Sequence, residues 1–246
     1  MIVRSDRPWT SLHLCGGMGG GGLGWLLAGA PGKSVDVSPS ACRNYEKLTG
    51  QEAVCEDITT MTPGDLRDVH GPEAPDMVVT SAPCKGLSRC MGAEKAQTEK
   101  YRQLNNVALY TVQLALEAWE IPPPLFYFEQ VPGILEAKNR PLLDRIIGTL
   151  HAYRYSVDVR VHDCGEIGGL AQRRKRVLIV ARHMDQVPNF MRLPQTHRVR
   201  GIGEVLGLLP LPLPGSSAGG PMHRLPELSE ENWARLAAIR AGKDWR

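Results

Sequence analysis

The chain has 246 residues, of which 42% are hydrophobic and 22% charged, and its formal net charge is +3. These values are ordinary for a globular protein with one substantial α/β domain and a short appendage, and so mild a charge does not by itself identify a nucleic-acid partner. No apolar run approaches the roughly 20 residues that span a bilayer. The first residues also lack the apolar core of a secretory signal, so we expect a cytoplasmic protein.

Strands and helices are predicted to alternate from residue 9 to about residue 182, which indicates a mostly parallel sheet with helices on both faces. Ser38 followed by Pro39 is typical of a helix start. Residues 208–221 are irregular, and a short helix is expected at 230–241. The predicted strands are residues 9–15, 34–37, 53–58, 76–80, 125–128, 155–161 and 177–181. Between them, the main helices are expected to follow residues 22 and 38 and to cover 98–120 and about 142–150.

The cysteines are scattered, and no two form the close CxxC pair of a zinc site or a redox dithiol. A chain of this length does not need disulfides, so we expect free thiols and no metal. The six are Cys15, Cys42, Cys55, Cys84, Cys90 and Cys164.

Ligands of parallel sheets bind at the carboxyl ends of the strands, and four segments of this chain fall there. The first is the glycine loop at 16–20, followed 20 residues after Gly16 by Asp36. Glycines allow close approach of a ligand, and a carboxylate after the next strand can bind ribose hydroxyls. The pattern favours an adenosine-containing cofactor, with Asp57 as a candidate contact to adenine. The alternative is a flexible loop with solvent-facing carboxylates.

The second segment places Cys84 directly after a buried strand and behind Pro83. A cysteine there is a candidate nucleophile, and positive charge from Lys85 and Arg89 would favour its thiolate. The alternative is an inert packing residue.

In the third segment, Glu129 ends an apolar strand, where a carboxylate needs a partner or a task. It is a candidate proton donor to a heterocycle, or else a carboxylate with a salt bridge at the sheet rim. The fourth segment is the basic run 173–176. Strand alternation predicts that Arg174 and Arg176 share one side, which favours contact with a polar or anionic ligand over a merely solvated face.

In this order, the segments resemble the motif series of the DNA cytosine-5 methyltransferases over residues 9–182. The glycine loop, Asp36 and Asp57 resemble the cofactor motifs, and Pro83-Cys84 with Gly86 and Ser88 resembles the catalytic loop. Glu129 with Val131 is similar to the Glu-Asn-Val segment, and the residues similar to its Gln-x-Arg-x-Arg motif are Gln172, Arg174 and Arg176.

The resemblance implies a Rossmann-like S-adenosylmethionine-dependent methyltransferase fold that methylates carbon 5 of a cytosine flipped out of double-stranded DNA. Cys84 would attack carbon 6, Glu129 would hold and protonate ring nitrogen 3, and Arg174 would orient the base, with Arg176 beside it. The implied cofactor residues are Cys15, Gly16, Gly17, Gly19, Gly20, Asp36, Val37, Asp57, Ile58 and Pro83. The implied substrate residues are Lys85, Ser88, Arg89, Gln130, Val131 and Gln172.

Three positions depart from the family pattern: Cys15 replaces a phenylalanine, Gln130 an asparagine and Lys85 a glutamine. Residues 1–190 are expected to form the cofactor-binding catalytic domain. Residues 191–246 are expected to be an irregular segment leading towards a target-recognition domain that this sequence does not contain. We therefore expect full activity to need a second polypeptide with that domain.

Three other hypotheses remain open at this point. An RNA cytosine-5 methyltransferase has the same fold, although the Gly86-Leu87-Ser88 run mildly favours DNA. A non-catalytic cofactor- or DNA-binding subunit is compatible with the C-terminal sequence. A dinucleotide-dependent oxidoreductase would explain the glycine loop and Asp36, but it leaves Cys84, Glu129 and Arg174 without a role.

Overall fold

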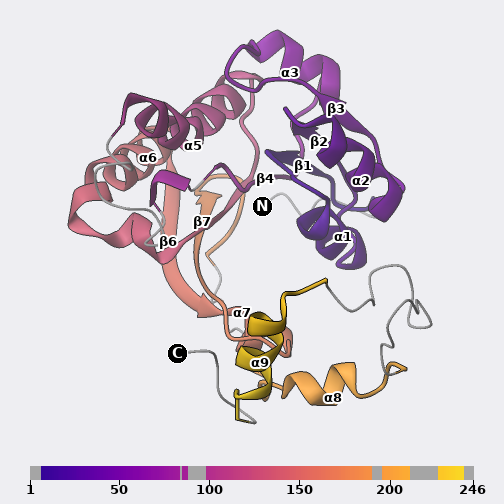
Figure 1. Ribbon diagram of the computed structural model, residues 1–246. Coiled ribbons are helices and arrows are strands. Elements are labelled where there is room, and N and C mark those ends of the chain that lie inside the picture. The colour runs from indigo at the N-terminus through magenta and orange to yellow at the C-terminus, as the bar shows by residue number, and fades with distance from the viewer. Residues whose placement is uncertain (1–6, 84, 88–97, 190–195, 211–226, 241–246) are drawn as a thin grey trace.

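The computed structural model describes residues 7–83, 85–87, 98–189, 196–210 and 227–240, with the backbone alone for Lys85 and residues 100–102. Figure 1 shows a twisted sheet with helices on both faces. Its seven strands run in the order β3-β2-β1-β4-β5-β7-β6. In chain order they are β1 Ser11–Leu14, β2 Gly32–Asp36, β3 Ala53–Cys55, β4 Met77–Thr80, β5 Leu125–Gln130, β6 Tyr155–Asp163 and β7 Lys175–His183.

Strand pairing confirms the expected α/β class and the mostly parallel sheet. β1 pairs in parallel with β2 and with β4, β2 pairs with β3, and β4 pairs with β5 in the same sense. Only β7 runs antiparallel to its neighbours, β5 and β6. Because the chain leaves β1 towards one side of the sheet and later returns to its other side at β4, the carboxyl end of β1 is a switch point, where open α/β sheets form a ligand crevice.

Alternating side chains of the central strands build two apolar layers. Val78 and Phe126 are fully buried on the face covered by α5 and α6, whereas Met77 and Val79 pack with Trp25 on the face of α1. Burial on both faces explains why the central strands are near-continuous apolar runs. The helices are α1 Gly20–Leu27, α2 Pro39–Thr49, α3 Pro63–His70, α5 Glu99–Glu117, α6 Arg140–Ala152, α7 Cys164–Gly168, α8 Ile202–Leu206 and α9 Glu230–Ala237. Short 3-10 turns are η1 Lys85–Leu87, η2 Pro132–Leu135 and η3 Ala137–Asn139.

Local sequence signals set several helix boundaries. The predicted start of α2 is confirmed: Ser38 Oγ accepts a hydrogen bond from Ala41 N at 3.4 Å, and Pro39 is the first helical residue. Gly50, at φ 70°, ends the same helix in the left-handed region that glycine tolerates best. In α3, Thr62 and Asp65 form a reciprocal capping box.

Some boundaries differ from those expected. The third strand ends at Cys55, because residues 57–60 fold into a turn closed by Asp57. α9 ends at Ala237, earlier than predicted, and none of its residues is buried. α7 and α8 were not predicted, since five residues are too few to show helical periodicity. Residues 211–221 of the irregular stretch lie outside the described residues, and the division of the chain at residue 190 stays a prediction.

None of the helices that the structure describes is long and apolar enough to cross a membrane.

The start of the central strands is fixed by one buried carboxylate. Asp76 is almost fully buried, and it accepts hydrogen bonds from Thr10 N at 2.8 Å and Thr10 Oγ1 at 3.1 Å. Arg7 makes a bidentate contact with the same carboxylate at 3.0 and 3.2 Å. These bonds join the segment before β1 to the residue before β4, so they set the relative position of the two strands.

We predict that Asp76→Ala lowers the free energy of unfolding by about 2–3 kcal/mol, because it leaves the half-buried Thr10 donors without their acceptor. Denaturant unfolding measures this loss. The control is Asp144→Ala, which removes an exposed carboxylate paired with Arg140 on α6 and is expected to cost less than about 0.5 kcal/mol. Equal losses in the two variants would contradict the role given to Asp76.

Candidate functional site

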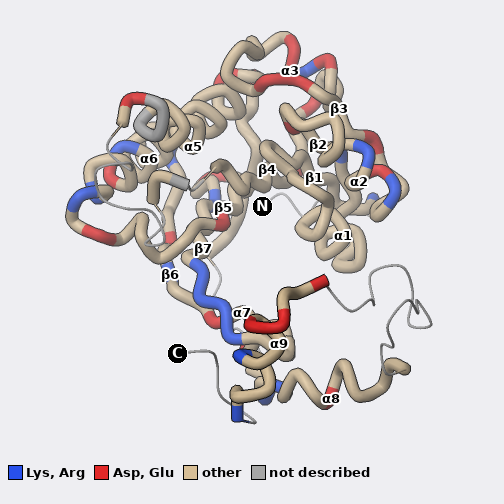
Figure 2. The backbone as a smooth tube through the Cα atoms, viewed as in Figure 1, with Lys and Arg blue, Asp and Glu red and all other residues tan. Residues whose placement is uncertain are grey.

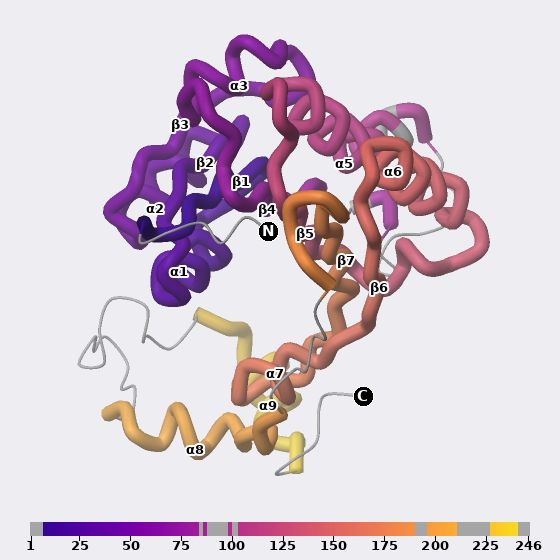
Figure 3. Tube along the Cα trace, turned by 180° about the vertical axis from the view of Figure 1, so that it is seen from behind, coloured from indigo at the N-terminus to yellow at the C-terminus, as the bar shows by residue number. Residues whose placement is uncertain are grey.

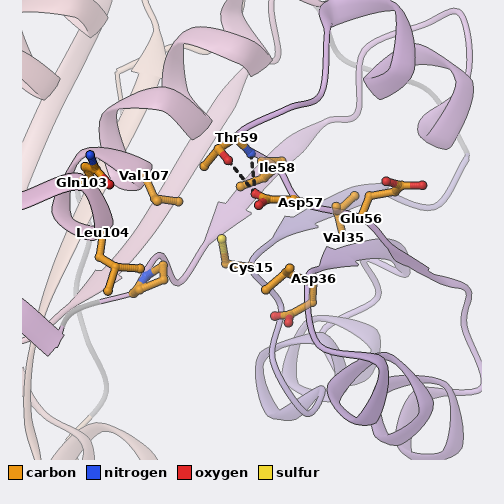
Figure 4. Close-up of a pocket in the computed structure, with 12 residues that line it drawn as sticks. Cys15, Val35, Asp36, Glu56, Asp57, Ile58, Thr59, Gln103, Leu104 and Val107 are labelled. Atoms are coloured by element: carbon orange, nitrogen blue, oxygen red, sulfur yellow. Dashed lines mark hydrogen bonds between the residues drawn. The ribbon is translucent and has the colours of Figure 1, made fainter. Parts of the chain in front are cut away.

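A pocket of about 400 Å³ opens at the carboxyl ends of β1, β2 and β3. Figure 4 shows Asp36 and Asp57 on one side of this pocket, Cys15 near its middle, and Gln103, Leu104 and Val107 of α5 on the opposite side. The predicted cofactor residues that line it are Cys15, Asp36, Val37, Asp57, Ile58 and Pro83. Its volume is within the range of small-molecule sites.

The glycine turn lies beside this pocket and connects β1 to α1. Gly17 and Gly19 have φ values of 58° and 92°, which favour glycine. Gly16 has no space for a side chain, because a Cβ there would collide with Ser34 Oγ. Gly20 begins α1, whose N-cap residue makes no side-chain capping bond. None of the four predicted glycines lines the pocket; the turn instead directs the backbone amide of Gly17 towards Asp36.

Asp36, the last residue of β2, is held by two backbone amides. Its Oδ2 accepts a hydrogen bond from Gly17 N and its Oδ1 one from Ser38 N, both at 2.9 Å. Each carboxylate oxygen can accept a second bond. The side chain is therefore fixed in orientation and can still accept hydrogen bonds from a ligand's hydroxyl groups.

Asp57 is held in a different way, by its own turn. Its Oδ1 accepts hydrogen bonds from Thr59 Oγ1 at 2.7 Å and from Thr59 N at 2.9 Å. These two bonds lower the pKa of Asp57, so the carboxylate keeps its charge in mildly acidic solution. The pocket thus presents two anionic acceptors from the ends of neighbouring segments.

Cys15 brings a neutral thiol into the pocket. Burial, together with the charges of Asp36 and Asp57, raises the pKa of Cys15 to about 12. Its backbone adopts φ 59°, which is rare for a residue other than glycine. At neutral pH the side chain is therefore an apolar group against which a ligand's aromatic or aliphatic part can pack.

Glu129 and Arg176 form an ion pair across the antiparallel strands β5 and β7. The Arg176 side chain is 17% exposed and that of Glu129 is 38% exposed, so the carboxylate is reachable from solvent while its partner is largely covered. The covered guanidinium holds the carboxylate in place. The arrangement agrees with a carboxylate at the sheet rim that has both a salt bridge and an accessible edge.

The rest of the basic run does not converge on Glu129. Arg173 contacts Glu166 at 3.1 Å and Asp163 at 3.5 Å, and it therefore associates with α7. Arg174 donates its backbone amide to Asp163 Oδ1 at 3.1 Å, and its side chain is exposed, as is that of Gln172. In Figure 2 this run is the continuous blue stretch between β7 and α7. Of the predicted arginines, only Arg176 meets the predicted acid.

The predicted nucleophile, Cys84, lies outside the described residues, as do Ser88, Arg89 and the side chain of Lys85. The backbone on either side of Cys84 is described. Pro83 lines the pocket, and Ala82 O accepts a hydrogen bond from Gln130 Nε2 at 2.9 Å. Gly133 packs so closely against Leu87 O that no side chain fits there. The end of β5 and the turn that follows it therefore anchor both flanks of the loop.

Gln130 and Val131 were expected to contact the substrate. In the structure the Gln130 side chain is 2% exposed and points to Ala82, and Val131 packs against the hydrophobic core. Gln130 Oε1 is buried with no hydrogen-bond partner among the described residues. These contacts give Gln130 a role in positioning the loop.

Sequence reasoning missed six of the residues that line the pocket. Three adjoin predicted residues on β2 and after β3, and three come from α5. A helix was expected over residues 98–120, but the sequence did not indicate which part of that helix reaches the strand ends. The missed residues are Val35, Glu56, Thr59, Gln103, Leu104 and Val107.

Residues 9–206 match the sequence profile of a protein family described as C-5 cytosine-specific DNA methylase. The chain belongs to this family. The match includes β1 to β7 and α8, so all the strands and pocket residues described above fall within the family domain.

Curated relatives are identical to the chain at about a quarter of the aligned positions. It is 27% identical to the Type II methyltransferase M.XorII of Xanthomonas oryzae pv. oryzae over 93% of its own length and 50% of that protein. It is 28% identical to M.NgoFVII of Neisseria gonorrhoeae over 80% of its own length and 50% of that protein. The chain thus spans about half the length of the curated relatives it matches.

Solved structures support the fold. A DNA modification methyltransferase described as putative, encoded within an Escherichia coli prophage, aligns with a TM-score of 0.65 and 18% identity over 80% of this chain and 54% of that one. The Dnmt2 methyltransferase of S. pombe aligns with a TM-score of 0.56 and 18% identity over 96% of this chain and 62% of that one. At such identities the likeness establishes the fold alone.

We predict that Gln130→Met lowers the free energy of unfolding by about 1–3 kcal/mol, because the buried Ala82 carbonyl loses its donor. Denaturant unfolding gives the value. Gln113→Met, at an exposed position of α5, is the matched control and should change stability by less than about 0.5 kcal/mol. If Gln130→Met were as stable as this control, the Ala82 bond would not anchor the loop.

Proposed function

We propose that this protein transfers the methyl group of S-adenosylmethionine to carbon 5 of cytosine in double-stranded DNA. The observation that carries the proposal is the placement of the pocket, the Pro83 end of the nucleophile loop and the Glu129–Arg176 pair at one edge of the sheet in a member of this family. A cofactor in the pocket and a base beside Glu129 would then both adjoin Cys84.

The pocket residues fit S-adenosylmethionine. Asp36 has acceptor capacity for the two ribose hydroxyls, since each of its oxygens has one amide partner and accepts a second bond. Asp57 adjoins Ile58, a buried apolar residue suited to contact adenine, and its charged carboxylate suits the adenine amino group. When bound, the cofactor supplies the methyl group.

The neutral Cys15 thiol is smaller than the phenylalanine typical of the family. It leaves more space beside the adenine site while keeping the surface apolar. We therefore expect a lower affinity for the cofactor than a phenylalanine at this position would give.

Cys84 is proposed to act as the nucleophile. The target cytosine has to leave the base stack before its ring atoms are accessible. Addition of the Cys84 thiolate to carbon 6 makes carbon 5 electron-rich, and the proton later lost from carbon 5 allows the thiolate to leave. Gln130 contributes by holding Ala82 O, two residues before the nucleophile.

Glu129 is proposed to bind ring nitrogen 3 of the cytosine and to transfer a proton to it as Cys84 adds. Arg176 then stabilises the carboxylate that the transfer leaves behind, because it already pairs with Glu129 from a covered position. Arg174, with its exposed side chain, is proposed to reach the base or a neighbouring phosphate once DNA is bound.

We further propose that a target-recognition domain, in the same or in a second polypeptide, supplies the base contacts that specify a DNA sequence, since the curated relatives are about twice as long as the matched region. The chain described here would provide the chemistry.

The first prediction uses duplex DNA carrying 5-fluorocytosine together with S-adenosylmethionine. Fluorine cannot leave carbon 5 as a proton does, so we expect a denaturation-resistant adduct that mass spectrometry maps to Cys84. Cys84→Ser should give no adduct while retaining cofactor affinity, and Glu129→Gln should slow trapping about 100-fold or more. Cys164→Ser, on α7, is the control that should trap like the parent.

A Cys84→Ser protein that methylates DNA as well as the parent would refute the mechanism. Absence of an adduct in a parent protein that still binds the cofactor would mean that base flipping needs the target-recognition domain.

The second prediction concerns the cofactor site. Asp36→Asn removes the charge of the carboxylate that is proposed to accept hydrogen bonds from the ribose hydroxyls. It should weaken S-adenosylmethionine binding about 10- to 100-fold, as expected for the loss of charged hydrogen bonds. Isothermal titration calorimetry measures the change. Asp158→Asn, an exposed carboxylate on β6 paired with Arg160, should bind like the parent. Tight binding of NAD without binding of S-adenosylmethionine would contradict the proposed function.

A further inference from the structure

Two cysteines, Cys42 and Cys55, lie together at the rim of the pocket. Cys42, in the first turns of α2, donates its thiol to Asp36 O at 3.4 Å and to Val54 O at 3.7 Å. Cys55, the last residue of β3, donates its thiol to Val37 O at 3.8 Å, and it is the register partner of Asp36. Two of the carbonyls that accept from these thiols belong to consecutive residues, Asp36 and Val37, which brings Cys42 and Cys55 close together. Both sulfurs therefore lie over the carboxyl ends of β2 and β3.

The backbone that holds this pair is also a wall of the pocket. The carbonyl acceptors of the two thiols include Asp36 and Val37, and Cys55 immediately precedes Glu56 and Asp57. Asp36, Val37, Glu56 and Asp57 all line the pocket. Any change in the spacing of the two sulfurs therefore acts on residues that carry the proposed adenosine contacts.

The two thiols differ in their access to solvent. Cys55 is exposed, whereas Cys42 is buried. Burial raises the pKa of Cys42 to about 11, and the neighbouring Cys55 adds to the effect. An oxidant in solution consequently reacts with Cys55 first, and Cys42 is the neighbouring thiol that can then react with the oxidised Cys55.

We propose that Cys42 and Cys55 are an oxidisable dithiol that a hydroperoxide converts into a disulfide at the rim of the pocket. The Cys55 thiolate attacks a peroxide oxygen and breaks the O–O bond, which gives Cys55 sulfenic acid and, for hydrogen peroxide, one water after protonation. Cys42 sulfur then attacks the Cys55 sulfur and forms the S–S bond, and the sulfenic oxygen leaves as a second water with the Cys42 proton. Two thiols are oxidised and one peroxide is reduced.

The disulfide should weaken cofactor binding, a consequence that rests on the proposed function. A disulfide requires about 2.05 Å between the sulfurs, much shorter than a thiol hydrogen bond. Bringing the two sulfurs to bonding distance draws the end of β3 towards α2 and breaks the sulfur contacts to Asp36 O and Val37 O. We expect the affinity for S-adenosylmethionine to fall about fivefold or more and to return on reduction.

Two other cysteines serve as internal references. Cys15 lies inside the same pocket, but with its pKa raised to about 12 it has almost no thiolate at neutral pH. Cys164 begins α7, which follows β6. Because β6 and β3 are the opposite edge strands of the sheet, α7 lies far from the end of β3 (Figure 3). Neither is expected to pair with Cys42 or Cys55.

The test treats the full chain with hydrogen peroxide at neutral pH, blocks free thiols with N-ethylmaleimide, and maps disulfides by non-reducing peptide mass spectrometry. The expected product is a Cys42–Cys55 linkage in the parent and in Cys164→Ser, and no such linkage in Cys42→Ser or Cys55→Ser. In Cys42→Ser, Cys55 should instead accumulate sulfenic or sulfinic acid. Cys55→Ser changes an exposed residue, so it keeps the test valid if the buried variant does not fold. Absence of the linkage, or equal yields of all cysteine pairings, would overturn the proposal.

Calorimetric titration of S-adenosylmethionine into reduced, oxidised and re-reduced protein tests the consequence for binding. A reversible loss of affinity in the parent, absent from Cys55→Ser, is the expected result, whereas equal affinity of the oxidised and reduced forms would overturn the coupling. A reduced protein that binds no S-adenosylmethionine would refute the proposed function. The disulfide map would then still test, independently, whether Cys42 and Cys55 form a disulfide.

Discussion

Parallel pairing of β1 with both β2 and β4 is the constraint on which the rest of the molecule depends. It places the carboxyl ends of three neighbouring strands, β2, β1 and β4, at one edge of the sheet, even though their residues are far apart in sequence. The buried Asp76, bonded to Thr10 and Arg7, fixes the opposite end of the same strands. A sheet assembled in this way produces the crevice before any functional side chain is considered.

At that edge, each polar group is held by a neighbour that leaves part of it accessible. Backbone amides from the glycine turn and the α2 start hold Asp36, a threonine holds Asp57, and a covered arginine holds Glu129. Charge is thereby oriented with little side-chain freedom left to lose when a ligand binds, which is the condition for preorganised recognition and catalysis. The cysteine pair adjoins the pocket because its thiols donate to the carbonyls of Asp36 and Val37, which line it.

Much of this arrangement was accessible from the sequence. All seven strands were predicted from short extended segments between turn residues, of which the buried parallel strand at 76–80 is apolar because both of its faces are covered. Ser38 and Pro39 set the start of α2 through local capping chemistry. Glycine positions, Asp36 and Asp57 were identifiable since they follow strands, and the order of motifs indicated the family.

Tertiary structure alone decided the rest, since pairing partners and contacts between distant segments are not encoded in local pattern. The antiparallel direction of β7, the choice of Arg176 over Arg173 and Arg174 as the partner of Glu129, and the burial of Gln130 against Ala82 all depend on which strands lie next to each other. Likewise, Cys42 and Cys55 look unrelated in the sequence, and only the packing of α2 over β2 and β3 brings their sulfurs together. The sequence by itself determined the strands, the main helices, the family and half of the pocket residues. The sheet order determined which of those residues meet, because hydrogen-bonded neighbours in a sheet can come from any part of the chain.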